Sequence, residues 1–273
     1  MGRIIESGLC TPINCGTGSF ATYYTYDLAG DLTSFSNGMG VTFNQSFDAA
    51  RRLTQLGSSW NDAQHPGTLF TTDSSIGYFP SGILRKATLG NGLTLTNMYN
   101  NRLQPCLMDV NSSNTTLNTC TDTAPSGNLL DYSYGYGAAN NGNVTQWNSV
   151  GSQTFTRTYS YDALNRLATM VDAASSQPCK GLSWTIDAWG NLTDQNLTSG
   201  SCTTLHAIVG TNNRFVSPYT YDAAGNMTYD GSHNYTYDAE GRIIKIDGGG
   251  TATYVYDANG NRVRRTAGSI ITD

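Results

Sequence analysis

Charged residues are scarce in this sequence of 273 residues: Asp, Glu, Lys and Arg together make up 13% of it, against about a quarter in ordinary soluble domains. The formal net charge is −5, which gives no basic surface of the kind that binds nucleic acid or anionic lipid. No apolar run approaches the roughly 18 residues of a membrane helix, and the opening MGRIIESGLC lacks the segments of a signal peptide. These absences argue against a nucleic-acid partner and against a membrane span.

Residues typical of catalytic and metal centres are equally scarce. The three histidines, His65, His206 and His233, are scattered along the chain without nearby metal ligands. No G-x-S-x-G motif marks a nucleophile, and the GGG of 248–250 lacks the lysine of a phosphate-binding loop. DANGN at 257–261 has neither the alternating acidic ligands nor the distal Glu of a calcium loop. We therefore predict no catalytic, cofactor-binding or metal-binding residues, and no enzymatic activity.

Six cysteines are present and none forms a C-x-x-C motif, so a zinc site is not indicated. Their order in the sequence suggests three disulfides, but six cysteines allow about 15 pairings and the order alone leaves the choice open. Disulfides would indicate an oxidising compartment, whereas six reduced thiols would fit a cytosolic protein. The pairs suggested by order are Cys10–Cys15, Cys106–Cys120 and Cys179–Cys202.

What the chain does contain is a repeat. Glycine occurs 30 times and tyrosine 17 times, a composition typical of short strands joined by turns. The shared pattern is aromatic-Asp-x-x-Gly-Asn/Arg-apolar. Copies are YDLAGDL (26–32), FDAARRL (47–53), YDALNRL (161–167), IDAWGNL (186–192), YDAAGNM (221–227), YDAEGRI (237–243) and YDANGNR (256–262), with worn copies at 99–105 and 136–144.

Each position of the pattern suits a tight hairpin turn. Aspartate is favoured at the first position of a type I turn, where its carboxylate accepts bonds from backbone N–H groups. Glycine at the fourth position adopts the left-handed conformation that lets the second strand leave in register. We therefore predict a hairpin turn at Asp222–Gly225. Asn165 is the next-best residue for the glycine position, and Arg51 departs from the pattern.

The segment around Arg51 allows a second interpretation. Apolar residues recur there every three or four positions, so SFDAARRLTQL (46–56) also fits an amphipathic helix capped by Ser46. We favour a hairpin because the segment aligns with the other copies.

Tyrosines approach the turns in pairs two residues apart, which places both members of a pair on one face of a strand. Aromatic cross-strand pairs contribute about 0.2–1 kcal/mol each. We expect these rings, with Trp147, Trp184 and Trp189, to carry the packing. The pairs are Tyr24/Tyr26, Tyr134/Tyr136, Tyr159/Tyr161, Tyr219/Tyr221, Tyr235/Tyr237 and Tyr254/Tyr256.

Between the tight turns lie looser ones of variable length, such as 229–235 and 246–254, and these variable turns hold the cysteines. One repeat is therefore strand, tight turn, strand, variable turn. The sequence predicts an all-β protein in which tandem hairpins form a curved, twisted antiparallel sheet. Because 2–5 (GRII) matches 241–244 and no capping segment closes the chain, we expect residues 1–273 to be one repeat region truncated at both ends.

The run from YDAAGNMTYDG to YVYDANGNRV, covering 221–263, resembles the YD repeats of bacterial RHS (rearrangement hotspot) proteins, which are related to insecticidal toxin-complex shells and teneurins. LGNGLTLTNMYNNRL (89–103) resembles a G-N-G-x-x-x-x-x-Y segment of the same arrays. The resemblance implies a spiral β-sheet shell around a toxic C-terminal domain. The self-cleavage signature D-P-x-G of those shells is absent, and no distinct toxin domain follows residue 262.

The resemblance implies a non-catalytic shell segment that encapsulates or presents a C-terminal toxin or effector. Its partners would be the rest of the shell and the toxin, and its location would be secreted or on the bacterial cell surface. The alternative is an extracellular module that binds carbohydrate or another cell-surface partner through exposed aromatic rings. Burial of the tyrosine pairs distinguishes the two.

Overall fold

The protein is built of β-strands joined by turns. The computed structural model describes residues 2–9, 20–173 and 178–272, and across those ranges it contains strands, turns and one short 3-10 helix, η1 (Asp247–Gly249), but no α-helix. The expected all-β fold of tandem antiparallel hairpins is confirmed. No helix of the described ranges is long and apolar enough to cross a membrane.

The strands form three sheets. The first contains β1 (Glu6–Leu9), β2 (Phe20–Tyr26), β3 (Leu32–Ser36), β4 (Thr42–Phe47), β5 (Leu53–Ser58), β6 (Thr68–Thr72), β7 (Lys86–Leu89), β8 (Thr94–Tyr99), β9 (Pro105–Asn111), β10 (Asn128–Gly135), β11 (Gln146–Gly151), β12 (Phe155–Tyr161), β13 (Leu167–Asp172), β14 (Cys179–Ile186), β15 (Leu192–Gly200) and β16 (Leu205–His206). The second contains β17 (Thr220–Tyr221) and β18 (Met227–Tyr229), and the third contains β19 (Tyr235–Tyr237), β20 (Ile243–Ile246), β21 (Ala252–Tyr256), β22 (Arg262–Ala267) and β23 (Ile270–Thr272).

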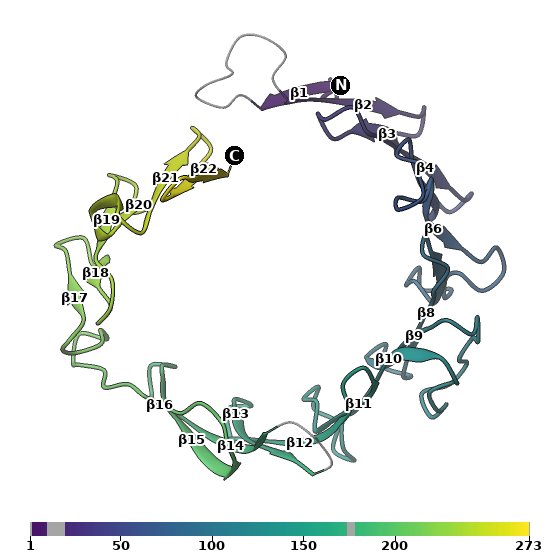
Figure 1. Cartoon of the computed structure of the whole chain (residues 1–273). Helices are drawn as coiled ribbons and strands as arrows, with labels where there is room; N and C mark the ends of the chain where they lie inside the picture. The colour runs from purple at the N-terminus through teal and green to yellow at the C-terminus, as the bar shows by residue number, and fades with distance from the viewer. Residues whose placement is uncertain (1, 10–19, 174–177, 273) are drawn as a thin grey trace. The chain divides into compact units, whose positions relative to one another are not determined.

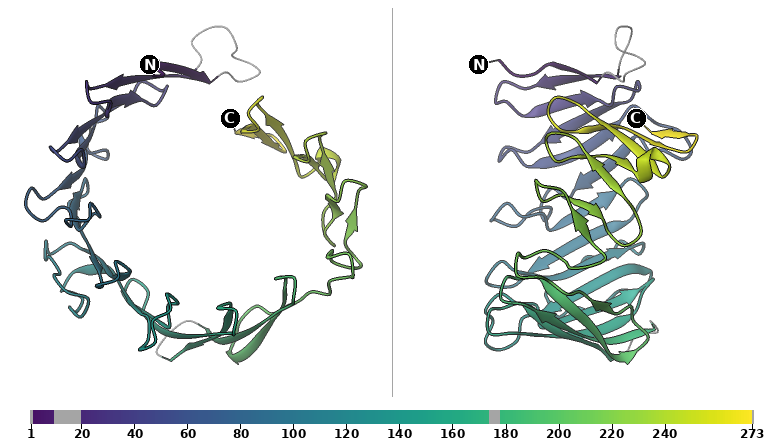
Figure 2. Two further views of the ribbon diagram at one scale, coloured as in Figure 1. Left: turned by 180° about the vertical axis from the view of Figure 1, so that it is seen from behind. Right: turned by 90° about the vertical axis from the view of Figure 1, so that its left-hand side faces the viewer.

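Within each sheet the strands lie in chain order, so each strand pairs with the strand before it and the strand after it (Figure 1). This is the arrangement of a repeat protein, in which each hairpin is stabilised by its nearest neighbours. The chain divides into two compact units: Phe20–Thr185 and Asp194–Leu205 belong to the first, and Ile186–Thr193 and His206–Asp273 to the second. Figure 2 shows the strands of the first unit side by side, with turns at both strand ends.

Tight and variable turns alternate along the chain, as the repeat predicts. In the first sheet the tight turns follow even-numbered strands, for example between β2 and β3 and between β12 and β13. The variable turns follow odd-numbered strands and differ widely in length, from 152–154 between β11 and β12 to 112–127 between β9 and β10. Because successive strands are antiparallel, the tight turns lie at one end of the strands and the variable turns at the other end.

The segment 46–56 is a hairpin and not a helix. Phe47 of β4 pairs with Leu53 of β5, and the Arg51 N–H donates to the Asp48 carbonyl at 2.9 Å. Arg51 has φ 62°, the left-handed conformation that glycine adopts in the better copies. The apolar residues of this hairpin lie three or four positions apart, as they do along one face of a helix. Their spacing alone therefore did not distinguish the two structures.

Two of the suggested disulfides are formed. Cys106 and Cys120 have Cα atoms 5.4 Å apart, and Cys179 and Cys202 have Cα atoms 4.5 Å apart. The pair Cys10–Cys15 lies outside the described residues. The first disulfide holds the connection 112–127, which we call the strap, against the sheet. There Leu117 of the strap packs into a buried cluster with Met98, Leu107 and Cys106.

The tryptophans do not all pack as expected. Trp147 contacts Tyr132, Tyr134 and Phe155, with ring centroids 5.3, 6.0 and 4.8 Å away. Trp184 is partly buried and donates to Gln195 Oε1 at 2.8 Å. The expectation for Trp189 was wrong, because this side chain is 74% exposed. It occupies the third position of its tight turn, between Asp187 and Gly190, where a side chain projects from the tip.

Candidate functional site

The repeated feature with the most developed geometry is the tight turn. In the 222–226 copy, the Asp222 N–H donates to the Asn226 carbonyl at 2.9 Å and the Gly225 N–H donates to the Asp222 carbonyl at 3.1 Å. Asp222 Oδ1 accepts the Asn226 N–H at 2.8 Å, and Gly225 has φ 95°. This is the predicted hairpin turn with its aspartate and glycine in the predicted roles.

The Asn/Arg position of the repeat has a role that the sequence analysis did not assign. Asn226 Nδ2 donates to Asp222 Oδ2 at 2.9 Å, and Arg242 Nε donates to Asp238 Oδ2 at 2.7 Å. The fourth residue after the aspartate therefore holds the second carboxylate oxygen while the first caps the turn. The same contact joins Arg52 to Asp48, Arg166 to Asp162, Asn191 to Asp187 and Asn261 to Asp257.

These contacts stabilise the charged form of the turn carboxylates. The Asn226 amide holds the pKa of Asp222 below its ordinary value, and the Arg242 backbone N–H does the same for Asp238. In the looser turns, the Tyr235 hydroxyl lowers the pKa of Asp230 to about 2, and the Thr251 hydroxyl lowers that of Asp247 to about 2. A hydrogen bond to a carboxylate favours its ionised form.

Acidification is therefore expected to destabilise the hairpins. A carboxylate with a depressed folded pKa contributes stability above its unfolded pKa and loses it as the pH falls through the folded value. For Asp230 and Asp247 the loss runs from the ordinary value of 3.8 down to about 2. Urea unfolding followed by circular dichroism at a series of pH values measures it. Asp230→Asn should lose less stability on acidification than the parent, and equal losses would contradict the assignment.

The tyrosine that precedes each aspartate joins one repeat to the repeat before it. Tyr237 Oη donates to the Met227 carbonyl at 2.7 Å, across two hairpins of the second unit. All twelve tyrosines of the predicted pairs are partly buried, so they pack between repeats as expected. Equivalent bonds run from Tyr26 to Ile4, Tyr136 to Pro105, Tyr161 to Val144 and Tyr256 to Ile243.

Removing one of these hydroxyls should cost stability. Tyr237→Phe keeps the ring but leaves the Met227 carbonyl without its partner, and a loss of about 0.5–1.5 kcal/mol in unfolding free energy is expected. Tyr23→Phe is the matched control, because Tyr23 is 56% exposed and the change should be nearly neutral. Urea midpoints of the two variants test the difference. Equal midpoints would show that the hydroxyl bond adds nothing.

Arginines of the Asn/Arg position also reach forward to the next repeat. Arg242, paired with Asp238, lies over the Tyr256 ring with its guanidinium carbon 5.0 Å from the centroid. Arg52, paired with Asp48, lies 4.9 Å from the Tyr78 centroid. Such cation–π contacts reinforce the hydroxyl bonds between successive hairpins.

Tyr78 is a repeat tyrosine that the sequence analysis missed. Its hydroxyl donates to the Leu53 carbonyl at 2.6 Å, the role played by the tyrosine in the better copies. The signal was present, since Tyr78 precedes Gly82 by the same four residues that separate Tyr221 from Gly225. Phe79 stands in place of the aspartate, and Gly82 keeps the required φ of 85°.

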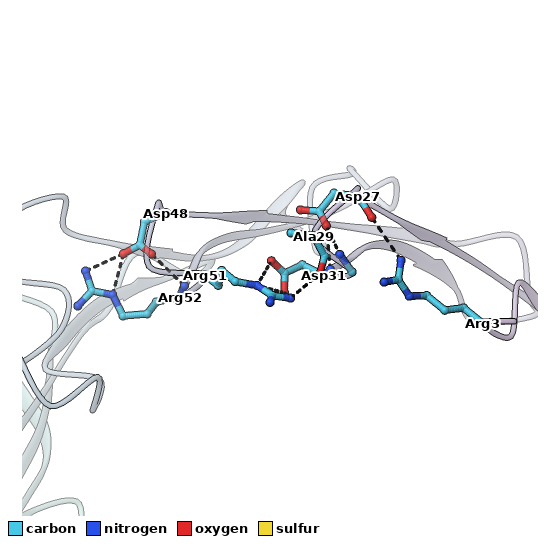
Figure 3. A network of polar contacts seen from close by, with 8 residues as sticks. Arg3, Asp27, Ala29, Asp31, Asp48, Arg51 and Arg52 are labelled. Carbon is cyan, nitrogen blue, oxygen red and sulfur yellow. Dashed lines mark hydrogen bonds and ion pairs between the residues drawn. The ribbon is translucent and has the colours of Figure 1, made fainter. Parts of the chain in front are cut away.

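Side-chain contacts also link the tight turns of adjacent hairpins, which lie at the same end of the strands (Figure 3). Arg51 Nε donates to Asp31 Oδ2 at 2.8 Å, and the same guanidinium donates to the Ala29 carbonyl at 3.1 Å. Arg51 therefore departs from the glycine pattern but bridges its turn to the preceding one. Arg3 makes a similar contact, donating to the Asp27 carbonyl at 3.4 Å.

The histidines form no shared site. His65 stacks on Trp60 with centroids 3.6 Å apart and pairs with Asp62 at 2.8 Å. His233 pairs with Asp247 at 2.8 Å, and His206 is exposed at β16. In the described part of the chain no three metal-ligating side chains converge. The turn at 257–261 uses its Asp257 carboxylate for Asn259 and Asn261.

A hollow of about 610 Å³ lies between the turns 222–226 and 238–242 of the second unit. Two of its acidic groups, Asp222 and Asp238, already hold their own turns together. Tyr237, which also lines it, donates to the Met227 carbonyl. These three polar groups therefore already hold the hairpins, Asp222 and Asp238 within their own turns and Tyr237 between hairpins.

Comparison with known proteins agrees with this geometry. The family model of the RHS repeat matches residues 140–177 and 237–269. These stretches include the hairpins β12–β13, β19–β20 and β21–β22, with their Tyr-Asp turns. The chain therefore contains RHS repeats.

Solved structures of toxin-complex proteins share the fold of this RHS-repeat protein. The Tc holotoxin pore of Photorhabdus luminescens matches with a TM-score of 0.71 at 18% identity, over 92% of this chain and 13% of that chain. The TcdB2–TccC3 crystal structure matches with a TM-score of 0.69 at 18% identity, over 92% of this chain and 14% of that one.

A third structure is TcdB2–TccC3 without its hypervariable C-terminal region, with a TM-score of 0.57 at 16% identity over 92% of this chain and 15% of that one. The shared fold therefore lies outside that hypervariable region. The RHS-repeat chain spans only about one seventh of the length of these structures, and no curated protein matches it.

Proposed function

We propose that residues 1–273 form a non-catalytic wall segment of an RHS-type shell that encloses or presents a C-terminal toxin or effector. The observation that carries the proposal is the repeated contact between hairpins: a tyrosine hydroxyl on the preceding backbone, as from Tyr237 to Met227. The polar groups of the repeat are used for structure: the aspartate and its Asn/Arg partner hold their own turn, and the tyrosine holds neighbouring hairpins together. A sheet whose repeats are joined in this way has a structural role as a continuous wall of repeats.

Secretion by a bacterium belongs to the same proposal. The disulfides Cys106–Cys120 and Cys179–Cys202 support an oxidising destination, because the cytosol keeps thiols reduced. The partners would be further repeats of the shell and the enclosed effector. The likeness to the toxin-complex structures supports this expectation, because one of them is TcdB2–TccC3 without its hypervariable C-terminal region, so that such a region belongs to the complete protein.

Binding of cell-surface carbohydrate is the competing function from the sequence. It requires tyrosine pairs that line an open groove. The paired tyrosines are partly buried, and five of them donate their hydroxyls to backbone carbonyls of the preceding repeat. This arrangement favours packing over ligand stacking.

The test is protease protection in the full-length product of the gene, after its reading frame has been extended by sequencing the flanking DNA. We expect further YD repeats and an unrelated C-terminal segment that resists protease while the wall is intact. Leu107→Arg places a charge at a side chain that is 1% exposed and should make that segment cleavable. Leu28→Arg is the matched control, because Leu28 projects fully from its turn.

Two outcomes would reject the proposal. One is stop codons directly bracketing residues 1–273, which would leave nothing to enclose. The other is a C-terminal segment cleaved equally fast in the parent and in both variants. Retention of the parent protein on a glycan array, lost on substitution of exposed rings, would favour the carbohydrate-binding function instead.

A further inference from the structure

Two carboxyl groups lie buried opposite each other in the first unit. Asp109 of β9 and Asp131 of β10 are register partners on adjacent antiparallel strands. Asp109 is 0% exposed and Asp131 is 6% exposed. Directly opposed residues have Cβ atoms about 4.5–5.5 Å apart, so the two carboxyl groups are neighbours. Burial of two like charges at this separation is strongly unfavourable.

Hydrogen bonding leaves part of this pair unsatisfied. Asn111 Nδ2 donates to Asp109 Oδ1 at 2.5 Å. Within the described ranges, no hydrogen-bond partner reaches Asp109 Oδ2, Asp131 Oδ2 or the hydroxyl of Thr96, which is the register partner of Asp109 on the other side. Buried polar atoms without partners are rare. A single proton placed between the two carboxyl groups would satisfy both Oδ2 atoms.

Among the described residues, no nearby cation neutralises the pair. Neither β8 nor β11, the strands on either side, contains a charged residue. Lys86 of β7 stands in the same row beyond Thr96, two strands and so about 9.6 Å from Asp109. Arg85 donates to Asn118 of the strap. Asp122, the acidic residue of the strap, accepts from the backbone N–H groups of Asn118 and Thr119.

The strap contacts the face of β9 on which Asp109 lies. Its Cys120 is bonded to Cys106, and its Leu117 packs against Leu107. Near the other end of β9, Asn111 Nδ2 donates to the Thr115 carbonyl of the strap at 2.9 Å. Leu107, Asp109 and Asn111 share one face of β9 because side chains alternate along a strand. The strap therefore contacts this face on both sides of Asp109.

We propose that Asp109 and Asp131 share one proton that keeps the strap closed, so that loss of this proton opens the strap. Ionisation of both groups would place two charges under the strap, and exposure to water would relieve their repulsion. The strap is thus a pH-sensitive element of the wall, closed in acid and loosened as the pH rises towards neutral and above. Because the Cys106–Cys120 disulfide remains, the strap stays attached to β9 at Cys120 while the rest of it loosens.

The direction in which the stability of the strap changes with pH follows from the titration of the two carboxyl groups. Burial, reinforced by the charge of Asp109, raises the pKa of Asp131 to about 6, and burial also raises that of Asp109. A carboxyl group with a raised folded pKa contributes stability that is complete below the ordinary value of 3.8 and is lost as the pH rises through about 6. The turn carboxylates act in the opposite sense and at lower pH.

Hydrogen exchange of the strap amides in the disulfide-intact protein tests the proposal. After correction for intrinsic rates, we expect the opening equilibrium of the strap to rise about tenfold between about pH 5 and about pH 8, because one proton with a pKa near 6 is released. Asp131→Asn removes the charge and should abolish the dependence. Asp222→Asn, in a turn of the second unit, should leave it unchanged.

Asp109→Asn is the second variant and should behave as Asp131→Asn does. Carboxyl carbon NMR of the parent provides a measurement that needs no substitution and should show Asp131 titrating with a pKa of about 6 and Asp109 with a raised pKa. A strap whose exchange keeps its pH dependence in both asparagine variants would overturn the proposal. So would protection at about pH 8 on addition of calcium alone, since the pair would then hold a metal ion in place of a proton.

Discussion

Replacement of Cys106 and Cys120 by serine together is expected to lower the free energy of unfolding by about 3 kcal/mol, the value for closing a loop of about 15 residues. The two cysteines are 14 residues apart. Their bond also anchors the strap, so its loss exposes Leu117, which is 4% exposed in the intact protein. Urea unfolding of the double variant followed by tryptophan fluorescence measures the change, and limited proteolysis within 112–127 reports the strap.

The double serine variant of Cys179 and Cys202 is the matched control. These cysteines are 23 residues apart, so a similar loss of stability is expected from loop entropy. They join β14 to the end of β15, however, and their removal should leave cleavage within the strap unchanged. Equal cleavage of the strap in both double variants would contradict the anchoring role of Cys106–Cys120.

Leu107→Ala is expected to cost about 2–5 kcal/mol, the range for truncating a buried leucine to alanine. Leu107 is 1% exposed and lies in the cluster with Met98, Cys106 and Leu117. That cluster is small, so the cavity left by the missing side chain has few neighbours that could fill it. The free energy of unfolding from urea titration measures the loss.

Leu28→Ala provides the comparison at constant chemistry. Leu28 occupies the second position of its tight turn and is fully exposed, so its truncation should change stability by no more than about 0.5 kcal/mol. A loss at Leu28 as large as that at Leu107 would mean that the turn tip is covered in solution. A small loss at Leu107 would mean that the strap cluster contributes little to the fold.

Local features of this protein were predictable because their determinants lie within five residues. Asp222 caps its own turn and Gly225 supplies the left-handed conformation, so the pattern D-x-x-G is sufficient to place a hairpin. At Arg51 and Phe79 one residue of the pattern is replaced, and the hairpins still form, with Phe47 paired to Leu53 and Tyr78 paired to Leu84. The segment 46–56 was ambiguous because Arg51 replaces the glycine that marks the turn in the better copies.

Features that depend on distant residues were not predictable. Trp189 is a different case, because its exposure follows locally from the third position of its D-x-x-G turn and was missed in the sequence. The burial of Asp109 and Asp131 depends on a strap that folds back over the sheet, and a charged residue in a strand normally indicates a solvated face. The role of the Asn/Arg position could be assigned only from the structure. It shows that backbone N–H groups bind one oxygen of the turn carboxylate and that the Asn or Arg side chain binds the other.

The amino-acid sequence by itself determined the all-β class, the alternation of tight and variable turns and the family, because each repeat encodes its own hairpin through short-range contacts. Only the tertiary structure decided which tyrosine hydroxyl meets which carbonyl, which loop becomes a strap and which aspartates are buried. Those outcomes depend on the register between strands and on the path of variable loops. Register and loop path are set by packing between residues far apart in the chain.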